Sequence, residues 1–592
     1  MDRLPIVYVR GYAGSTAGID DAADDPFYGF NLGSTHVRID GDGDPLFHQF
    51  EGPLLRLIHD EGYKLFAEGD QHRYLLENEE VDPKSLWVYR FYDQAATTFM
   101  PPHKSGIRRA AAKLYQKVTA EGFDIESAAE GLYKLITLVR EKTGAEKVHV
   151  VAHSMGGLVV RCMMQKICLL SVDEGVSRRQ RRRLTKLLLR PWAKRGARIP
   201  MLGTPREPAS KLVARFFTYG TPHGGIASRV WGVDWFQKTF GPAGSYIFDP
   251  QKMYGYLNPH AGFGDVPPRS ADWDPQAIPE EVFSADDIFC LIGTNSKDYQ
   301  AWHGLSRLSA GPSSDGLVLI DRAYVHGAHR AYVHRSHSGR YGLVNSEEGY
   351  QNLRRFLFGQ WGVGVSLVGL PPAPDGSPWQ ADMRLAIRGL PIVMSERRTE
   401  HWCPILLSEE IRSQRAPLRS VPLVSTFLLE PGQTAKAEPP HQGRMRYTMA
   451  LQVFKVQERD DFFRPNDHLE QVPEWADWLI IDMRPATDGC RLQAWAAWKS
   501  TVAGENDRFD PITELPRSFG LSGDSFIDLP IGAQALPVLG EDARLRISVH
   551  DRRRVRVAPP RKRGGTEYPI NSRLGRLISD LRRLLLWRRR RL

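Results

Sequence analysis

Apolar residues in the first 360 positions alternate between short continuous runs and stretches with helical spacing. The runs at 148–152 and 288–293 are almost wholly apolar, which predicts buried strands. Residues 125–142 place apolar side chains at helical spacing just before the first run, which predicts a helix leading into a strand. Such strand–helix–strand units predict an α/β fold with a mainly parallel sheet. Further strands are expected at 4–9, 86–92 and 216–219, and further helices at 54–61, 107–121 and 347–358.

From position 361 onward the apolar residues alternate with polar ones, and helical periodicity is scarce. Turn residues separate the alternating runs, which fall at 383–387, 423–428, 445–453, 478–483, 492–498 and 545–549. This pattern predicts an all-β, sandwich-like region. Residues 371–374, which are rich in proline, are interpreted as a linker or domain edge. The expected domains are therefore an α/β domain at 1–360, a β domain at 361–551 and a basic segment at 552–592.

The positive charge of the chain is concentrated in two segments. The formal net charge is +10, and residues 552–592 alone carry 15 Arg and Lys against two acidic residues. Arg178 to Arg198 holds ten basic residues and no acidic one. Residues 572–587 also place leucines at helical spacing, which predicts an amphipathic helix too short and too charged to cross a bilayer. We expect Arg178–Arg198 and Arg561–Leu592 to meet an anionic membrane surface. The alternatives are a solvated helix that caps the domain for the first segment, and a helix docked on the rest of the protein through its leucines for the second. Nucleic acid is not expected as the partner.

Targeting signals and metal motifs are not evident in the sequence. The first residues lack the basic and long apolar regions of a signal peptide, and no run of about 18 apolar residues occurs. Five scattered cysteines without a CxxC spacing favour reduced thiols over disulfides or a zinc site. We therefore expect a cytoplasmic or peripheral membrane protein without cofactor or metal, and export by a signal-independent route remains open.

The most informative stretch is 146–160, which reads EKVHVVAHSMGGLVV. Its buried-strand run is followed at once by Ser154 and then by a helix-like stretch. A strand, a sharp turn with serine and a helix form the context of a nucleophile elbow, in which small neighbours let strand and helix pass closely. Gly156 and Gly157 meet this need, and Ala152 stands where the G-x-S-x-G pattern has its first glycine.

Residues 1–359 resemble the lipases and esterases of the α/β-hydrolase superfamily. The resemblance rests on Ser154 in its AHSMGG context and on four further motifs in the same chain order: RGYAG at 10–14, GTPHGG at 220–225, SDGLV at 314–318 and SHSG at 336–339. Arg10 stands where the family usually has histidine, so this motif matches only in part. The resemblance implies an α/β-hydrolase fold for this part of the chain.

The resemblance also implies roles for individual residues. Ser154 is the expected nucleophile, Asp315 the acid and His337 the base, in the chain order Ser, Asp, His that the fold uses. The backbone N–H groups of Tyr12 and Met155 are the expected oxyanion-hole donors. His334 is the alternative base, followed by His326 and His329, and the alternative acids are Asp298 and Asp321. His223 precedes the acid in the chain and is interpreted as structural.

These features favour a serine carboxylester hydrolase of lipase or phospholipase type that acts near membranes. The aromatic-rich insertion at 231–274 is interpreted as a lid or pocket wall over an apolar acyl site, and the alternative is packed scaffold. One alternative is a soluble esterase, thioesterase or acyltransferase with the same three residues. Another is a non-catalytic scaffold that binds anionic lipid or nucleic acid through its basic segments.

Overall fold

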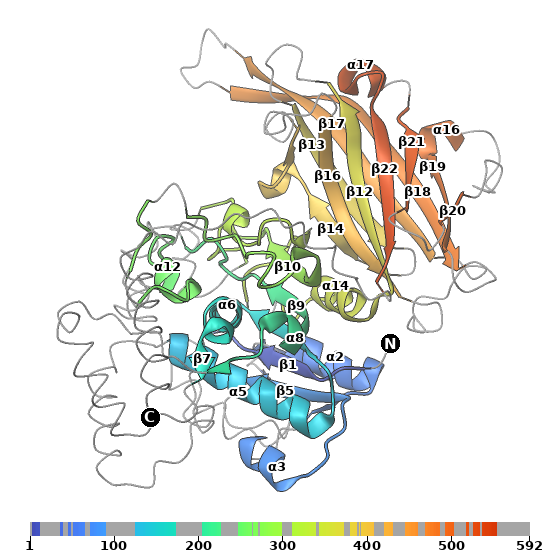
Figure 1. Ribbon diagram of the computed structural model, residues 1–592. Helices are drawn as coiled ribbons and strands as arrows, with labels where there is room; N and C mark the ends of the chain where they lie inside the picture. The colour runs from blue at the N-terminus through green and yellow to red at the C-terminus, as the bar shows by residue number, and fades with distance from the viewer. Residues whose placement is uncertain are drawn as a thin grey trace, which may run out of the picture. The chain divides into compact units, whose positions relative to one another are not determined.

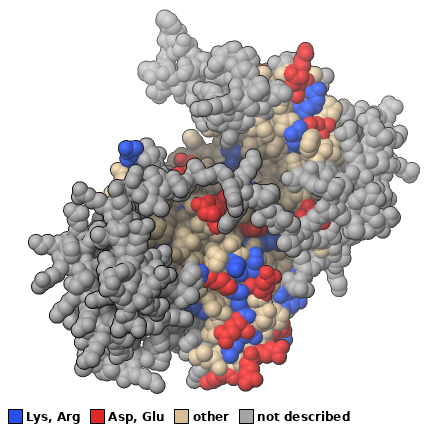
Figure 2. Space-filling view, viewed as in Figure 1, with Lys and Arg blue, Asp and Glu red and all other residues tan. Residues whose placement is uncertain are grey.

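The structure is a computed structural model, shown in Figure 1. Residue contacts group Met1–Arg552 into one unit and Arg553–Leu592 into a second. The second unit, with its expected amphipathic helix, lies outside the described residues, as do the basic stretch 178–198 and the expected helix at 107–121. On the face seen in Figure 2, acidic and basic side chains of the described part are interspersed. The structure describes residues 3–11, 36–39, 45–48, 51–65, 71–89, 125–172, 204–226, 247–262, 265–269, 273–298, 311–338, 342–371, 379–387, 390, 392–407, 419–429, 445–459, 468–485, 492–502, 517–519, 525–532 and 535–552.

A seven-stranded parallel sheet organises the N-terminal region. Its spatial order is β11-β10-β9-β6-β1-β5-β4, and every neighbouring pair is parallel, as the alternation of strands and helices predicts. The chain places β1 centrally, adds β4 and β5 on one side, and then crosses to the other side with β6. The strands are β1 (Ile6–Val9), β4 (Lys64–Leu65), β5 (Ser85–Tyr89), β6 (Val148–His153), β9 (Val213–Tyr219), β10 (Ile288–Gly293) and β11 (His329–Val333).

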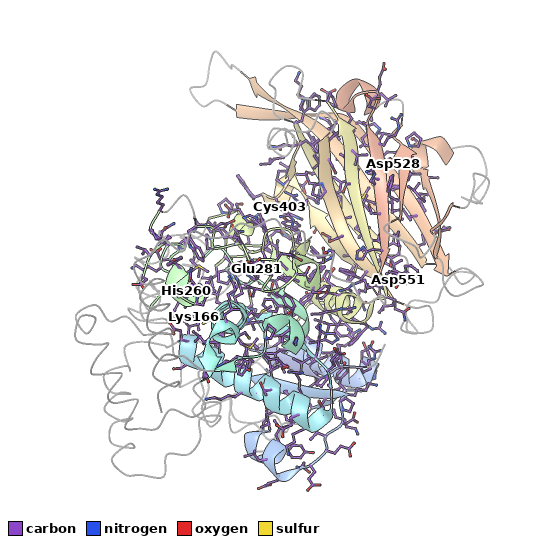
Figure 3. The ribbon with its side chains drawn as sticks, in the orientation of Figure 1. Lys166, His260, Glu281, Cys403, Asp528 and Asp551 are labelled. Carbon is purple, nitrogen blue, oxygen red and sulfur yellow. The ribbon has the colours of Figure 1, made fainter. Side chains whose placement is uncertain are left out.

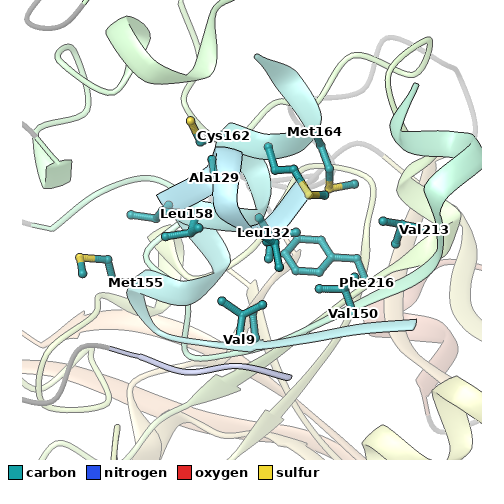
Figure 4. Close-up of a cluster of buried hydrophobic side chains, with 14 of the residues drawn as sticks. Val9, Ala129, Leu132, Val150, Met155, Leu158, Cys162, Met164, Val213 and Phe216 are labelled. Atoms are coloured by element: carbon teal, nitrogen blue, oxygen red, sulfur yellow. The ribbon is translucent and has the colours of Figure 1, made fainter. Parts of the chain in front are cut away.

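Helices cover both faces of this sheet, and Figure 3 shows side chains filling the space between them. Residues of α5 (Ile125–Thr143) and α6 (Met155–Gln165) share one buried cluster with alternate strand residues such as Val7 and Val150. A part of this cluster is drawn in Figure 4. Residues of α2 (Glu51–Glu61) and α14 (Glu347–Phe358) share a second cluster with the intervening strand residues. Strand residues alternate between two buried faces, which explains the continuous apolar runs in the sequence.

The remaining elements of the N-terminal region are short. Of the insertion at 231–274, the structure describes residues 247–262, 265–269 and 273–274, and α12 is its helix there. These short elements are β2 (His36–Ile39), β3 (Pro45–His48), α3 (Gln71–Glu77), η2 (Ile167–Leu169), β7 (Ser171–Val172), β8 (Thr204–Pro205), α8 (Ala209–Leu212), α12 (Tyr254–Leu257), η4 (Ala285–Asp287) and η6 (Ile320–Arg322).

Two antiparallel sheets follow and confirm the all-β prediction. The first has the order β16-β12-β22-β21, and the second β14-β13-β17-β18-β19-β20 with β15 paired to β13. Residues of both sheets contribute to one buried cluster, as expected for a sandwich-like arrangement. The elements are β12 (Trp361–Leu370), β13 (Trp379–Ile387), β14 (Val393–Arg397), η7 (Thr399–His401), β15 (Ile405–Leu406), β16 (Arg419–Leu428), β17 (Met445–Arg459), β18 (His468–Pro485), β19 (Leu492–Trp498), α16 (Lys499–Val502), β20 (Arg517–Phe519), β21 (Ser525–Pro530), α17 (Leu536–Leu539) and β22 (Arg544–Asp551).

The proline-rich stretch that is interpreted as a linker or domain edge lies mostly outside the described residues, since the structure describes only Pro371 of it. Strand β12, which precedes this stretch in the chain, belongs to the first antiparallel sheet, and β13, which follows it, belongs to the second.

The parallel and antiparallel regions share buried residues. Cys403, which follows η7, belongs to the apolar cluster beneath α5 and α6. Phe427 and Leu429, at the end of β16, belong to the cluster beneath α2 and α14. The side chain of Asn352 in α14 also donates a hydrogen bond to the Met394 carbonyl oxygen in β14, at 2.8 Å. These contacts explain why residues 1–552 form one unit.

Candidate active site

Ser154 occupies the single position between strand β6 and helix α6. Its backbone has φ 51° and ψ −127°, and Ser154 and Trp402 are the two non-glycine residues with positive φ in the described part of the chain. Such a conformation costs about 1–3 kcal/mol and persists only where the surroundings hold it. Here the Ser154 N–H donates to the Tyr219 carbonyl oxygen at 2.9 Å. A Cβ on Gly156 would lie 2.5 Å from the Arg10 carbonyl oxygen, so the elbow requires the small residue that the sequence supplies.

Parallel strands bring distant loops to this elbow. Because the carboxyl ends of parallel strands lie at one edge of a sheet, loops that follow β6, β10 and β11 meet there. Ser154 follows β6, Asp315 lies on the connection between β10 and β11, and His337 follows β11. The backbone N–H of His337 donates to the Asp315 carbonyl oxygen at 2.9 Å, which joins the last two loops directly.

The structure brings the three predicted side chains into one hydrogen-bonded chain. His337 Nε2 lies 2.9 Å from Ser154 Oγ, and His337 Nδ1 lies 2.8 Å from Asp315 Oδ2. Asp315 and His337 are 1% and 3% exposed, so little water competes for these hydrogen bonds. The Ser154 hydroxyl makes no capping hydrogen bond to α6, although it stands at the N-cap position. Its Oγ therefore faces the imidazole and can transfer its proton there.

The carboxylate of Asp315 is fixed by backbone donors as well as by histidine. Its Oδ1 accepts the N–H groups of Leu317 at 3.0 Å and Val318 at 2.8 Å. The Asp-Gly turn of the sequence folds the chain back so that both donors reach the side chain, and Gly316 takes φ 99° in this turn. With Oδ1 occupied by amides, Oδ2 is left for His337. This arrangement orients the imidazole with Nε2 toward Ser154.

His153 is a residue of this site that the sequence did not single out. Its Nε2 lies 3.1 Å from the backbone carbonyl oxygen of His337, and the two rings are 5.1 Å apart. Burial, together with the proximity of His337, lowers the pKa of His153 well below 6.5, so the ring is neutral at neutral pH. The ring thus tethers the base loop to the residue that precedes the nucleophile. Only its adjacency to Ser154 could have drawn attention to it in the sequence.

The alternative bases lie elsewhere. His334 Nδ1 lies 3.3 Å from Thr294 Oγ1, and the residue is exposed. His326 Nε2 is 3.0 Å from Asp274 Oδ2, and the His329 ring packs on Phe427. These three histidines therefore have other neighbours, whereas His337 has Ser154 and Asp315.

His223 is buried against the sheet, in agreement with its structural interpretation. It is 0% exposed, and its Nε2 lies 3.2 Å from Thr218 Oγ1. Burial and the nearby Arg161 lower the pKa of His223 well below 6.5. Of the alternative acids, Asp298 accepts a hydrogen bond from the Asn295 side chain at 2.7 Å, and Asp321 is exposed.

Of the two expected oxyanion-hole donors, the structure describes Met155 and does not describe Tyr12. Met155 is the first residue of α6, and the N–H groups of a first helical turn have no acceptor within the helix. Tyr12 lies outside the described residues. The loop that leads to it does approach the nucleophile, because a Cβ on Gly11 would lie 3.2 Å from Ser154 Cβ.

Within the described ranges, no group of three or more His, Cys, Asp or Glu side chains could hold a metal ion. In the same part of the chain, no helix has the length and apolar character needed to cross a membrane.

A comparison with known protein families supports the fold. Residues 110–188 match the family described as alpha/beta hydrolase of unknown function (DUF900). The described part of this match contains α5, β6, Ser154 and α6. No curated protein matches the chain. Together with the seven-stranded parallel sheet, the match assigns an α/β-hydrolase fold to the N-terminal region.

Proposed function

We propose that this protein is a serine carboxylester hydrolase of lipase or phospholipase type. The observation that carries the proposal is the hydrogen-bonded chain from Ser154 through His337 to Asp315, with distances of 2.9 and 2.8 Å. This geometry matches the arrangement of nucleophile, base and orienting acid that acyl transfer requires. The α/β-hydrolase fold supports a hydrolase in general, and the lipid ester is the proposed substrate.

The proposed reaction begins when His337 Nε2 takes the proton of Ser154 Oγ while Oγ attacks the acyl carbonyl carbon. The N–H groups of Met155 and Tyr12 are the proposed donors to the negative oxygen of the tetrahedral intermediate. When the intermediate collapses, the ester C–O bond breaks and the alcohol leaves with the proton from His337. Water then attacks the acyl-enzyme, His337 takes the water proton, and the carboxylic acid leaves as Ser154 regains its hydrogen. Asp315 holds the imidazole and stabilises the imidazolium throughout.

The lipid substrate is proposed from the lipase resemblance of the sequence motifs. The described part of the insertion at 231–274 packs Phe248, Met253 and Leu257 into the buried cluster of α5 and α6. These side chains therefore serve as packed scaffold, and a lid or pocket wall would have to come from other residues of the insertion. The basic stretches 178–198 and 561–592 are the proposed contacts to an anionic membrane surface. A soluble esterase, thioesterase or acyltransferase would use the same three residues.

The test combines covalent labelling with turnover. We expect a fluorophosphonate probe to label wild type, and replacement of Ser154 by alanine to abolish labelling and to lower kcat by about a millionfold. Turnover of short-chain esters, long triglycerides, phospholipids and thioesters, measured side by side, separates the lipase from its alternatives. Ser500→Ala is the control, because this serine pairs with Asp477 in the antiparallel region. A folded Ser154→Ala protein that kept a tenth of the activity would refute the assignment.

A further inference from the structure

One turn of the antiparallel region contacts both loops that carry the acid and the base. The turn comprises Thr399–Cys403 and includes η7. On the acid loop, Ser313 Oγ donates a hydrogen bond to the Trp402 carbonyl oxygen at 3.4 Å. On the base loop, the His334 ring stacks on the His401 ring, with centroids 3.7 Å apart and an interplanar angle of 15°. These contacts lie two residues before Asp315 and three residues before His337 in the sequence.

The strand that leads into this turn, β14, also holds β11, the strand that precedes the base loop. The Tyr332 N–H in β11 donates to Ser395 Oγ in β14 at 3.1 Å, and Ser395 is 2% exposed. The Arg397 guanidinium lies 4.8 Å from the centre of the Tyr332 ring. Because β11 stands at the end of the parallel sheet, β14 supplies contacts on the side opposite β10.

The turn is itself held firmly, so it can act as a support. The backbone N–H and the hydroxyl of Thr399 donate to Asp382 Oδ1 at 2.8 and 2.9 Å. Cys403 is 4% exposed and packs into the apolar cluster of α5 and α6. Trp402 ends η7 with φ 58°, and its backbone N–H donates to the Thr399 carbonyl oxygen at 3.0 Å.

The histidine stack suits this supporting role because it is uncharged. Burial and the neighbouring His334 and Arg398 lower the pKa of His401 to about 4. Burial also lowers the pKa of His334. Both rings are therefore neutral at neutral pH, and they stack without charge repulsion.

We propose that the turn Thr399–Cys403 positions the loops that carry Asp315 and His337, so that the antiparallel region is part of the catalytic unit although it supplies no reacting group. This inference rests on the proposed function of Ser154, Asp315 and His337. The physical reason is that proton transfer requires close geometry, and a displacement of about 1 Å can cost about 100-fold in rate. His401 and Ser395 are the positioning residues, since His401 stacks on His334 of the base loop and Ser395 holds Tyr332 in the strand that leads into it, without contact to Ser154.

The first test varies His401. His401→Ala removes the stacked ring and is expected to lower kcat for a soluble short-chain ester by about 10- to 100-fold, with KM unchanged. His401→Phe retains a flat ring on His334 and is expected to restore kcat to within about twofold of wild type. A structural role alone would lower the melting temperature in both variants and leave kcat, measured well below that temperature, unchanged.

The second test uses a matched pair of serines. Ser395→Ala removes the hydroxyl that accepts the Tyr332 N–H, whereas Ser500→Ala removes a hydroxyl bound to Asp477 Oδ2 at 2.5 Å. We expect kcat to fall in Ser395→Ala and to stay at the wild-type value in Ser500→Ala. These variants also decide the question if His401→Ala does not fold.

The outcomes separate the inference from the proposed function. Activity that survives in Ser154→Ala overturns the proposed function, and the inference falls with it. A dead Ser154→Ala protein, together with folded His401→Ala and Ser395→Ala proteins that keep kcat within twofold, overturns the positioning role alone. An equal loss of kcat in Ser395→Ala and Ser500→Ala also overturns it, because the effect would then not depend on contact with the base loop.

Discussion

In the parallel sheet, β6 and β10 are buried at every position, whereas β13 and β22 of the antiparallel region alternate between buried and more exposed positions. The difference follows from the helices. A parallel sheet is covered by helices on both faces, while each antiparallel sheet has one face on the shared core and one toward solvent. Continuous apolar runs and alternating runs in the sequence thus report two kinds of packing in one chain.

The two regions also differ in where their strands end. The parallel strands all end at one edge, so residues that are far apart in sequence, such as Ser154 and His337, meet there. Antiparallel neighbours end at opposite edges, and their polar residues pair across strands instead. Arg446 with Asp482 and Arg546 with Asp528 are pairs of this kind, each with two hydrogen bonds. The candidate chemistry lies in the parallel region for this topological reason.

The largest expected effect is the loss of kcat when the base or the acid of the parallel region is replaced. We expect His337→Ala and Asp315→Asn to lower kcat by about 10,000-fold or more, because the base or its orienting carboxylate is lost. Asp482→Asn is the matched control in the antiparallel region, and it should lower stability while leaving kcat unchanged. His223→Ala and His334→Ala should be milder than His337→Ala. A loss in His334→Ala equal to that in His337→Ala, measured by steady-state kinetics, would move the base to His334.

The sequence predicts which residues of a strand or helix are buried better than it predicts which distant residues come into contact. Periodicity located β6, β10 and α14, and chain order within the lipase resemblance selected Asp315 and His337. The pattern of apolar positions did not predict β12, because this strand contains glycines, which are typical of turns. A Cβ on Gly362 would lie 2.0 Å from the His550 imidazole, so this glycine serves close packing within a sheet.

Contacts to the catalytic loops from outside the resemblance were also missed. His153 reaches a carbonyl oxygen 184 residues away, and His401 reaches a ring 67 residues away. Such contacts depend on how two complete elements pack, and neither residue carries a local motif that reports its partner.

The next effect concerns stability within the parallel region. Lys166, labelled in Figure 3, is 5% exposed at its side chain and donates to Glu126 Oε1 at 2.9 Å and to the Gly255 and Ala261 carbonyl oxygens at 2.6 and 2.8 Å. Lys166→Met removes the ammonium group that the buried Glu126 carboxylate contacts, and breaking a buried ion pair typically costs about 3–5 kcal/mol of unfolding free energy.

The control for this prediction is an ion pair of the antiparallel region. The side chains of Arg546 and Asp528 are 36% and 32% exposed. Arg546→Met should therefore cost less than about 1 kcal/mol, since solvent screens such pairs. Denaturant unfolding measures both. Equal losses of unfolding free energy in the two variants would show that burial of the ion pair does not determine how much its removal destabilises the protein.

A smaller effect is expected from pH. Burial lowers the pKa values of His149, His153 and His223 well below 6.5, and all three lie in the parallel region. Below pH 6.5 the unfolded chain binds protons that the folded chain does not. Stability should therefore fall as pH decreases, by about 1.4 kcal/mol per pH unit for each such histidine.

Replacement of one buried histidine measures how much that residue contributes to the pH dependence of the unfolding free energy. His149→Phe keeps a ring against Phe358 and should make the unfolding free energy less sensitive to pH between 6.5 and 5. Wild type, measured over the same pH range, is the reference. An unchanged slope in His149→Phe would mean that His149 is not neutral in the folded protein.

The smallest expected effect on stability lies at the boundary between the two units. Residues 553–592 hold 14 Arg and Lys against two acidic residues and form a unit apart from Met1–Arg552. Truncation after Arg552 should leave the melting temperature and short-ester turnover unchanged, and it should weaken binding to phosphatidylserine vesicles at low salt, with 178–198 as the remaining basic contact. Each engaged basic residue contributes about 1 kcal/mol of attraction, and salt screens it.

A second truncation, made two residues earlier, is the comparison for this prediction. Arg552 donates to the Phe356 carbonyl oxygen at 2.7 Å, and its guanidinium lies 4.2 Å from the centre of the Phe427 ring. Truncation after His550, only two residues earlier, removes these contacts between β22 and the end of α14 and should lower the melting temperature. A lowered melting temperature after the Arg552 cut, with vesicle binding unchanged, would instead mean that residues 553–592 stabilise the unit formed by 1–552. Equal melting temperatures for the two truncations would show that Arg552 does not hold the antiparallel region to the parallel one.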